Sequence, residues 1–254
     1  MTRPHPTPAG PSVTPGAPEA AWRRWLPAQP WPELRLDVAG RTVLVCAAHP
    51  DDDVLAIGGL MSALAASGAR LNLLAATDGE ASHPASSVLR PHELAATRIA
   101  ETGAALAALG IRPAESVRLR LPDSGLEAVE AALTAAVTEA AQGVDLVLAP
   151  WAHDAHPDHE ALGRAALSAG ATHGTTVLAF PVWTWQWAAP GDPRVPWERA
   201  LRVPLSAGQR AAKRAAVDCF ATQVRPLGPA PEDAAVLSPE VLTSFDRKVE
   251  VVFG

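Results

Sequence analysis

The sequence of 254 residues has little cysteine, no excess of basic residues and no long apolar run. Its two cysteines lie in an apolar strand pattern (Cys46) and in a helical pattern (Cys219), so we predict two core thiols and no disulfide framework. The formal net charge of −6 gives no basic footprint for nucleic acid or for an anionic membrane surface. No segment has the length of a signal-peptide core or of a membrane span. We therefore expect a soluble, cytoplasmic protein that binds a small neutral or cationic molecule.

A glycine-rich phosphate-binding turn is also missing. The turn after the apolar run 43–46 contains no Gly-x-Gly-x-x-Gly and carries acids where a pyrophosphate would need backbone amides. This argues against a dinucleotide-binding oxidoreductase.

Composition divides the chain into an arm and one domain. Residues 1–32 are crowded with proline and show no hydrophobic period, which predicts a largely disordered arm whose deletion through residue 20 changes neither folding nor turnover. Trp22, Trp25 and Trp31 are the exception, because large aromatic side chains are rarely left in water, and we expect the end of the arm to dock through them. A hydrophobic content of 48% suits one substantial core, built from residues 33–254.

From residue 42 onward, strand patterns alternate with helix patterns. The predicted strands are 42–48, 70–77, 116–121, 145–149 and 176–180, and the predicted helices are 54–67, 91–109, 126–141, 158–169 and 206–222. Repeated strand-helix-strand units of this length predict an α/β, Rossmann-like three-layer fold with a mostly parallel sheet and a single domain. In such sheets the ligand lies beyond the carboxyl ends of the strands, where the loops after residues 48, 77, 121 and 149 all fall.

A histidine and three aspartates follow the first strand. His49 ends the strand, Pro50 stops the hydrogen-bond ladder, and Asp51 to Asp53 place three carboxylates in one tight turn. The carboxylates repel one another unless a cation neutralises them, and an imidazole beside them suits a divalent metal such as zinc. The alternative is that the acids simply cap the next helix, and we expect one of them to do so. Capping needs one acid and no histidine, so the pattern favours a metal-binding or catalytic role.

A second loop, Pro150–Glu160, holds three histidines and two aspartates within seven residues. Ligands from the two loops together would give three protein ligands and an open fourth position, the arrangement of a catalytic zinc site. A spare carboxylate could then act as base, and a spare imidazole could donate to the tetrahedral intermediate. The alternative is a histidine-rich surface turn that captures metal adventitiously.

Two motifs, His49-Pro-Asp-Asp52 and His156-Pro-Asp-His159, resemble the paired motifs of the LmbE-like, or PIG-L-like, family of zinc-dependent deacetylases that act on N-acetylglucosaminyl groups. The resemblance covers about residues 40 to 225. Weaker matches are Thr77-Asp-Gly-Glu80, Arg98 with Glu101, Leu109-Gly110, Asp123, Lys213 and Gln223.

Site roles follow from this resemblance. It implies one Zn²⁺ per chain with the ligands His49, Asp52 and His159, the general base Asp51, and His156 as oxyanion stabiliser or acid. It implies that Asp158 orients His156 or the ligands. Substrate contacts are expected from Asp78, Glu80, Arg98 and Asp123, although stabilisation of a turn is an equal alternative for the first two.

Some residues fall outside the family pattern. Asp53 stands where the family usually has Glu, which puts the contact of that Glu in doubt. His153 is expected to be a solvated loop residue. Trp183, Trp185 and Trp187 alternate with polar residues, which in a strand would place three indoles on one face, either to stack on a sugar or to pack in the core.

The sequence thus predicts a zinc-dependent hydrolase that removes an acyl group, most simply acetyl, from the nitrogen of an amino sugar or its conjugate. Neither nucleic acid nor membrane is an expected partner. The alternative from another class is a non-catalytic sugar-binding protein on the same fold.

Overall fold

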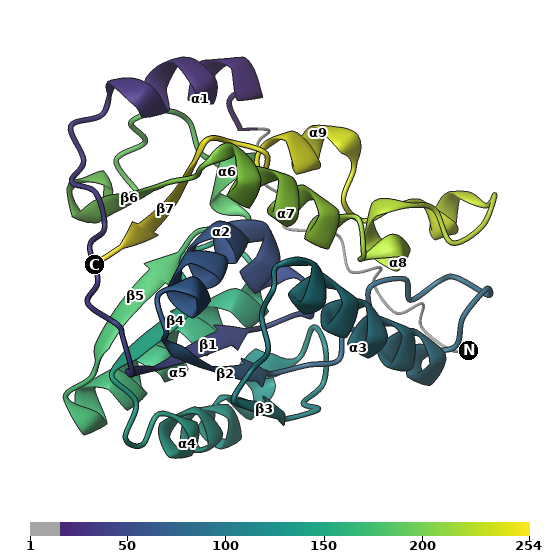
Figure 1. Ribbon diagram of the computed structural model, residues 1–254. Coiled ribbons are helices and arrows are strands. Elements are labelled where there is room, and N and C mark those ends of the chain that lie inside the picture. Colours follow the sequence, from purple (N-terminus) through teal and green to yellow (C-terminus); the bar gives the residue numbers. More distant parts are fainter. Residues whose placement is uncertain (1–15) are drawn as a thin grey trace.

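The computed structural model describes residues 16–254 and forms a mixed sheet with helices on both faces (Figure 1). The described strands have the order β3-β2-β1-β4-β5-β7-β6. Their bounds are β1 Thr42–Ala47, β2 Arg70–Ala75, β3 Glu115–Arg118, β4 Leu146–Pro150, β5 Thr176–Phe180, β6 Ala200–Pro204 and β7 Val249–Phe253. Strands β1 to β5 pair in parallel, whereas β7 is antiparallel to both β5 and β6.

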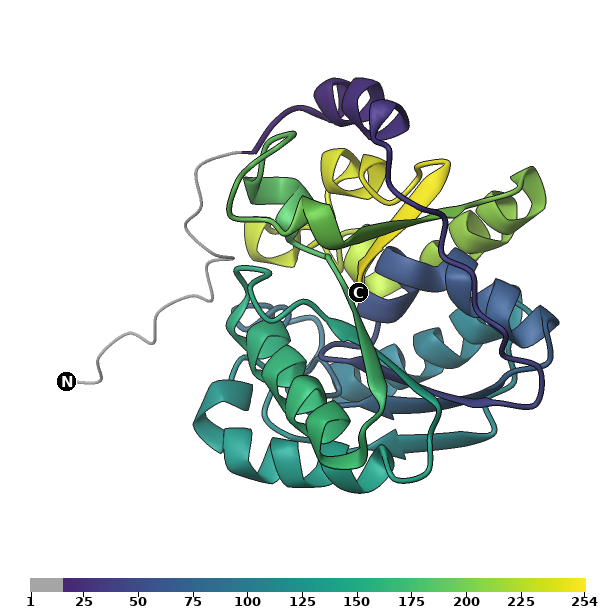
Figure 2. The same ribbon diagram turned by 90° about the vertical axis from the view of Figure 1, so that its left-hand side faces the viewer.

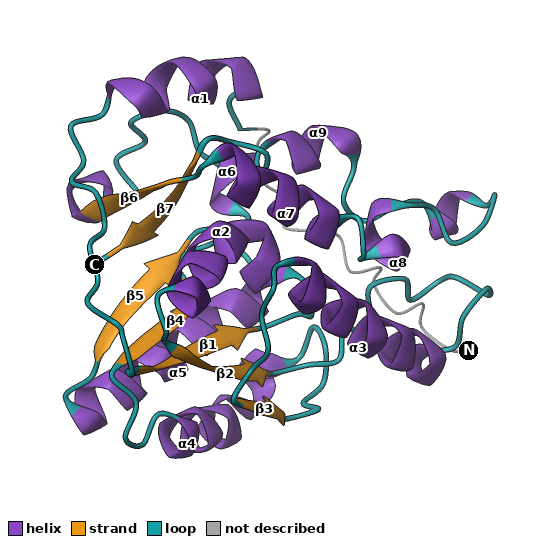
Figure 3. Cartoon of the chain, in the orientation of Figure 1, coloured by secondary structure: helices purple, strands orange, loops and turns teal. Residues whose placement is uncertain are grey.

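Side chains of β1 point alternately into two buried clusters, as the period of a strand requires. Val43 and Val45 belong to one cluster, and Leu44 and Cys46 to the other. Helices α2 (Asp52–Ala66), α3 (Pro91–Ala108) and α7 (Ala207–Val217) cover the first face, and α4 (Glu130–Ala140) and α5 (Pro157–His173) cover the second (Figures 2 and 3). The predicted three-layer α/β fold with a mostly parallel sheet is confirmed.

Strands β6 and β7 were missing from the prediction. Residues 200–204 pair with β7 along its whole length, so β7 lies between two strands that precede it in the chain. Short strands that follow irregular segments carry no periodic signal of their own, because their partners are set by contacts across many residues.

The end of the arm is folded, contrary to the disorder predicted up to residue 32. Helix α1 (Glu19–Trp25) packs through Trp22, which is fully buried, and its ring meets Trp185 edge to face at 5.2 Å between ring centroids. Trp25 and Trp31 also contact the ring of Trp197. The apolar area of these indoles outweighs the proline-rich composition around them. Docking through the three tryptophans is confirmed, while residues 1–15 lie outside the described residues.

The alternating tryptophans 183–187 do not form a strand. Trp183 precedes a single helical turn, α6 (Thr184–Trp187), and Trp185 alone of the three is fully inside the core. Five residues of period two were too few to separate a strand from a turn of helix.

Helix α2 bends at Ile57, whose backbone is not helical. The bend frees the amides of Gly59 and Leu60, and the buried Glu250 carboxylate accepts both at 2.8 Å. Lys213 donates to the same carboxylate at 2.7 Å. A Cβ on Gly59 would lie 2.4 Å from Leu205, so glycine permits the close packing predicted for this helix.

Among residues 16–254, no helix combines the length and the apolarity that a membrane crossing requires.

Candidate active site

The site lies where the order of the parallel strands reverses. β1 and β4 are neighbours, while the chain continues from β1 to β2 on one side and from β4 to β5 on the other. The loops after β1 and β4 therefore leave the same edge of the sheet and diverge, which opens a crevice between them. The first loop carries His49, and the second leads into α5, which carries His159.

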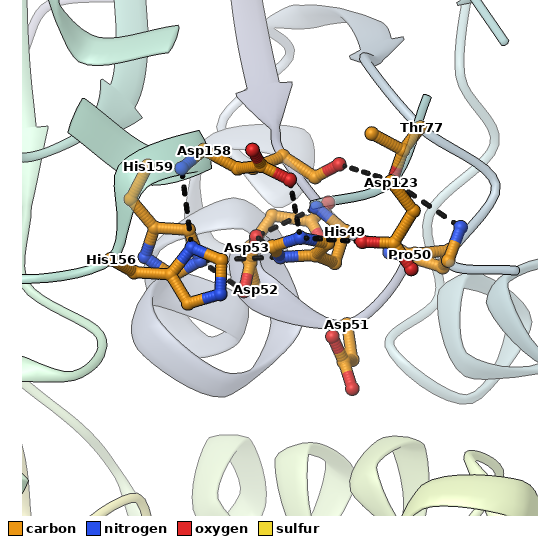
Figure 4. A network of polar contacts seen from close by, with 12 residues as sticks. His49, Pro50, Asp51, Asp52, Asp53, Thr77, Asp123, His156, Asp158 and His159 are labelled. Atoms are coloured by element: carbon orange, nitrogen blue, oxygen red, sulfur yellow. Dashed lines mark hydrogen bonds and ion pairs between the residues drawn. The ribbon is translucent and has the colours of Figure 1, made fainter. Parts of the chain in front are cut away.

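His49, Asp52 and His159 converge in this crevice (Figure 4). The Nδ1 atom of His49 lies 3.3 Å from Nε2 of His159 and 3.4 Å from Oδ2 of Asp52. The Nε2 atom of His159 lies 3.2 Å from Oδ1 of Asp52. Two imidazole nitrogens and a carboxylate at these separations can bind one divalent metal, with a position left open toward the cavity.

On each of the two imidazoles, the ring nitrogen that does not face the other candidate ligands lies next to a carboxylate. Nε2 of His49 lies 3.2 Å from both Asp123 and Asp158, and Nδ1 of His159 lies 2.7 Å from Asp154. Such partners fix the ring orientation and strengthen a histidine as a metal ligand.

The charges around the two imidazoles favour a cation. Burial alone would lower the pKa of His49, but Asp52 and the hydrogen bonds to Asp123 and Asp158 raise that pKa well above its ordinary value. The pKa of His159 is raised to about 9 against its own burial, chiefly by Asp52 and Asp154. The carboxylates therefore stabilise positive charge at this position, and a divalent metal would supply it. The donor set thus fits the predicted metal.

Asp154 is a site residue that the sequence analysis missed. Besides His159 it accepts the backbone amides of Val182, Trp183 and Thr184 and the hydroxyl of Thr184, and it is fully buried. It therefore joins His159, a candidate metal ligand, to the segment after β5. The need of a ligand histidine for a carboxylate partner was the signal that could have found it.

Asp51 lies at the N-cap of α2 but makes no capping hydrogen bond with its side chain to the residues described. Asp52 accepts the backbone amide of His49, whereas Asp53 accepts the amide of Val54 in the first turn of α2, so of the three acids it is Asp53 that supports the start of the helix. Figure 4 shows the Asp51 carboxylate apart from the histidine cluster. Burial raises its pKa, whereas Arg98, at 3.2 Å, opposes the rise and the neighbouring Asp52 adds to it.

Gly79 allows Arg98 to reach Asp51. Its φ of +71° is a left-handed conformation, and a Cβ there would lie 2.1 Å from Nη1 of the guanidinium. Arg98 also donates to the carbonyl of Gly79 at 3.0 Å. Within the Thr77-Asp-Gly-Glu80 match, this contact accounts for the glycine.

His156 lies at the N-cap of α5, where its Nδ1 accepts the amide of Asp158 at 3.3 Å. Burial, together with His159 and His49, lowers the pKa of His156 to about 3. An accepting Nδ1 on a neutral ring leaves the proton on Nε2, so the ring can donate a hydrogen bond. The same residue lines the cavity beside the metal ligands.

The remaining predicted contacts divide into two groups. Arg98 and Asp123 line the cavity, as do all the predicted ligands and catalytic residues except His159, which is buried behind them. Asp78 and Glu80 lie outside its lining: Arg118 donates twice to Asp78, and Glu80 accepts the amide of Asp123. We therefore do not propose Asp78 or Glu80 as substrate contacts, because neither residue lines the cavity.

The cavity in front of the cluster has a volume of about 630 Å³. That lies within the roughly 300–1,000 Å³ typical of sites for small molecules. Its lining combines polar side chains such as Ser82, Arg98 and Gln223 with apolar ones such as Leu237 and Phe245.

A family model described as "PIG-L: GlcNAc-PI de-N-acetylase" matches residues 44–170, half of the chain. The matched region includes both histidine motifs and every candidate metal ligand. This chain belongs to the PIG-L family. No curated protein matches the sequence closely enough to count as a relative.

Solved structures with this fold include deacetylases. The chitobiose deacetylase from Pyrococcus horikoshii is 22% identical with a TM-score of 0.53, and the match covers 71% of either chain. A triple mutant of a deacetylase from the teicoplanin biosynthetic pathway is 19% identical with a TM-score of 0.60, covering 84% of this chain and 96% of that one. A 4-carboxy-2-hydroxymuconate hydratase from Pseudomonas putida is 18% identical with a TM-score of 0.52, over 84% and 94%. These likenesses support the fold, which also carries chemistry other than deacetylation.

The departure at Asp53 from the usual PIG-L family Glu lies behind the site. Asp53 is buried, hydrogen-bonds the backbone of Val54 and is outside the cavity lining. Burial raises its pKa to about 7, with Asp52 and Asp51 adding to the rise. Asp53 thus supports the first turn of α2, while His49, Asp52 and His159 converge without it.

Proposed function

We propose that this protein is a zinc-dependent N-deacetylase, with one ion per chain, that removes an acetyl group from the nitrogen of an amino sugar or its conjugate. The observation that carries the proposal is the convergence of His49, Asp52 and His159 at one end of a ligand-sized cavity, with carboxylates behind both imidazoles. Membership of the PIG-L family supports the reaction type.

The metal would be held by Nδ1 of His49, Nε2 of His159 and the carboxylate of Asp52. A divalent ion bound there supplies a Lewis acid for the amide carbonyl and for a water molecule. Asp158 and Asp123 orient His49, and Asp154 orients His159, so both rings are placed before substrate arrives.

Asp51 is the proposed general base. Its carboxylate lines the cavity next in sequence to a ligand, and burial raises its pKa toward the range in which it can accept a proton from water. Arg98 lies 3.2 Å from this carboxylate and opposes the rise of its pKa.

His156 is proposed to donate through Nε2 to the oxygen that becomes negative when the amide carbon turns tetrahedral. Its neutral ring and accepting Nδ1 favour this role over that of a charged acid. Asp158 sets the ring through its backbone amide and at the same time orients His49 through its carboxylate.

The amino-sugar assignment is supported by polar groups in the cavity lining. Ser82, Arg98, Asp123, Ser124 and Gln223 line it and offer donors and acceptors suited to sugar hydroxyls. Of these, Arg98 and Asp123 remain the proposed substrate contacts from the sequence.

A test is the release of acetate from N-acetylated amino-sugar conjugates by the zinc-loaded protein. We expect turnover by the parent and none by Asp52→Ala. Sugar binding without acetate release would favour the non-catalytic alternative, and the absence of both would refute the amino-sugar assignment.

A further inference from the structure

A second cavity, of about 340 Å³, lies between α7, α9 (Pro239–Thr243) and α1 (Figure 1). Helix α9 borders both cavities. Val241 lines the cavity in front of the candidate metal ligands, Leu242 lines the second cavity, and Phe245, two residues after the helix, lines both. No candidate metal ligand or proposed catalytic residue lines the second cavity. It has the size of a small-molecule site, yet the proposed reaction makes no use of it.

Positive side chains gather around the second cavity. Helix α7 contributes three of them, at positions i, i+3 and i+4, which lie on one face of a helix, and α1 and the segment after α9 contribute one each. The five are Arg23, Arg210, Lys213, Arg214 and Arg247. The lining holds only two acids, Asp218 and Asp246. This is a local excess of positive charge in a protein whose formal net charge is −6.

Three carboxylates form ion pairs with these five cations. The pairs are Arg23 and Arg247 with Glu19, Arg210 and Arg214 with Asp246, and Lys213 with Glu250. Asp218 is the other acid of the lining and is exposed. Positive charge therefore exceeds negative charge even when all four acids are counted.

Two of the guanidinium groups keep a buried N–H without an acceptor. Glu19 accepts from Nε and Nη2 of Arg247, whose residue is 6% exposed, but Nη1 has no hydrogen-bond partner among residues 16–254. Arg210 donates from Nη2 to Asp246 at 3.4 Å, while its buried Nε lacks a partner in the same part of the chain. A buried donor without an acceptor costs free energy, so an acceptor from outside the chain would be stabilised here.

The pKa of Arg247 agrees with this need for an anion. Burial lowers that pKa, Glu19 opposes the change, and the neighbouring charge of Arg23 adds to it. A bound anion would favour the charged form of the guanidinium.

The lining also offers an apolar surface to a ligand. Val217 continues the cationic face of α7 by one turn, and Pro239, Leu242 and Phe245 lie opposite it on α9 and the segment after it. Guanidinium groups bind the oxygens of phosphate and carboxylate with good geometry, and the apolar side chains would cover a carbon body attached to such a group.

We propose that the second cavity is a binding site for a small organic anion, whose phosphate or carboxylate group bonds Arg210 and Arg247 and whose apolar body packs on Leu242 and Phe245. The site is separate from the candidate metal ligands. The proposal therefore goes beyond the deacetylase assignment and does not depend on it.

Calorimetry of the metal-loaded protein with phenyl phosphate and with benzoate tests the proposal and identifies the preferred anionic group. We expect saturable binding of one molecule per chain for at least one of the two probes. Inorganic phosphate should bind at least about 10-fold more weakly than phenyl phosphate, because it lacks the apolar body. Binding of neither organic probe would overturn the proposal.

The variant Arg210→Gln should raise the Kd of the bound probe by about 10-fold or more, since it removes a charged donor. Arg210 is chosen over Arg247 because loss of Arg247 would also break the buried ion pair with Glu19. Arg164→Gln is the matched control: it removes the same charge from α5, where Arg164 pairs with Glu130 outside the second cavity. The control should keep the Kd of the parent, and an equal Kd in both variants would overturn the proposal.

The variant Asp246→Asn distinguishes a ligand site from a set of surface ion pairs. Asp246 competes with a bound anion for Arg210 and Arg214, so its neutralisation should tighten binding of the probe. Weaker binding in this variant would contradict the proposed contacts.

A metal ion can also bind phosphate or carboxylate, and Asp52→Ala excludes this explanation. That variant is expected to lose zinc, and it should bind the probe with the Kd of the parent because Asp52 does not line the second cavity. Loss of binding in Asp52→Ala, with binding retained in Arg210→Gln, would locate the anion at the metal and overturn the proposal. Binding of the probe by a parent protein that releases no acetate would overturn the deacetylase assignment alone.

Discussion

Arg247 donates from Nη2 to Oε2 of Glu19 at 2.6 Å and from Nε to both carboxylate oxygens, across 228 residues of sequence. The guanidinium is buried and lies 4.3 Å from the centroid of the Trp185 ring. Arg247 follows the cavity residue Phe245 by two positions, and Trp185 follows the cavity residue Trp183 by two. Helix α1 thus holds together two segments that line the cavity.

Glu19→Ala should destabilise the protein by ~3 kcal/mol, because it leaves a buried guanidinium without its carboxylate. Thermal unfolding would measure the loss. The control is Glu139→Ala, an exposed acid on α4, which should change the free energy of unfolding by less than about 0.5 kcal/mol. Deletion of residues 1–20 removes Glu19 and should be as damaging, whereas composition alone predicted no effect. An unchanged melting temperature in both variants would contradict the bracing role of α1.

Asp52→Ala and Asp51→Asn should differ in metal content. Asp52 is the proposed ligand, so its removal should release zinc and abolish turnover together. Asp51→Asn keeps the shape of the side chain and should retain zinc while kcat falls by ~10²–10⁴-fold, the range for a positioned proton acceptor. Elemental analysis and acetate release measure both quantities. Loss of zinc in Asp51→Asn, or turnover within a few fold of the parent, would show that another group is the base, with Asp158 the next candidate.

Asp154→Asn should lower zinc affinity by ~10–100-fold, because the amide is a weaker partner for Nδ1 of His159. The amide group would also oppose backbone donors from Val182 to Thr184. Glu160→Gln is the control within the same loop, since that carboxylate accepts the amide of Ala155 and is outside the predicted ligand set. A competition titration with a chelator compares the two affinities, and equal values would refute the role of Asp154.

Gly79→Ala should displace Arg98 and reduce kcat by ~10²-fold, the effect expected when a group at the site is misplaced by about 1 Å. Strain at positive φ costs about 1–2 kcal/mol as well. Gly110→Ala is the matched control, because Gly110 has φ +72° but no described atom would lie within 4 Å of the added Cβ. The control should lose stability and keep its turnover. Equal turnover in both variants would mean that Arg98 does not depend on Gly79.

The sequence predicted best what local patterns determine. Residues 49–52 and 156–159 each lie within one loop and the start of a helix, so their convergence followed once a parallel sheet was recognised. The role of Asp154 was not predicted, because it depends on contacts with residues 182–184, which lie beyond the next strand. The ion pair of Glu19 and Arg247 was not predicted for the same reason, since its partners are 228 residues apart in the sequence. The partners of Asp78 and Glu80, Arg118 at the end of β3 and the amide of Asp123, lie about 40 residues further along the chain, and no local pattern reveals them.

The position of β7 between β5 and β6 governs the order in which the site can be assembled on the ribosome. During synthesis from the N-terminus, β1, β4 and His159 are complete before residues 249–253 emerge. Strand β6 then has to wait for its sheet partner, and the edge of β5 stays open to pairing with other chains. The candidate ligands can therefore converge before β7 joins β5 and β6, and until it does the edge of β5 has no partner among the described strands on that side.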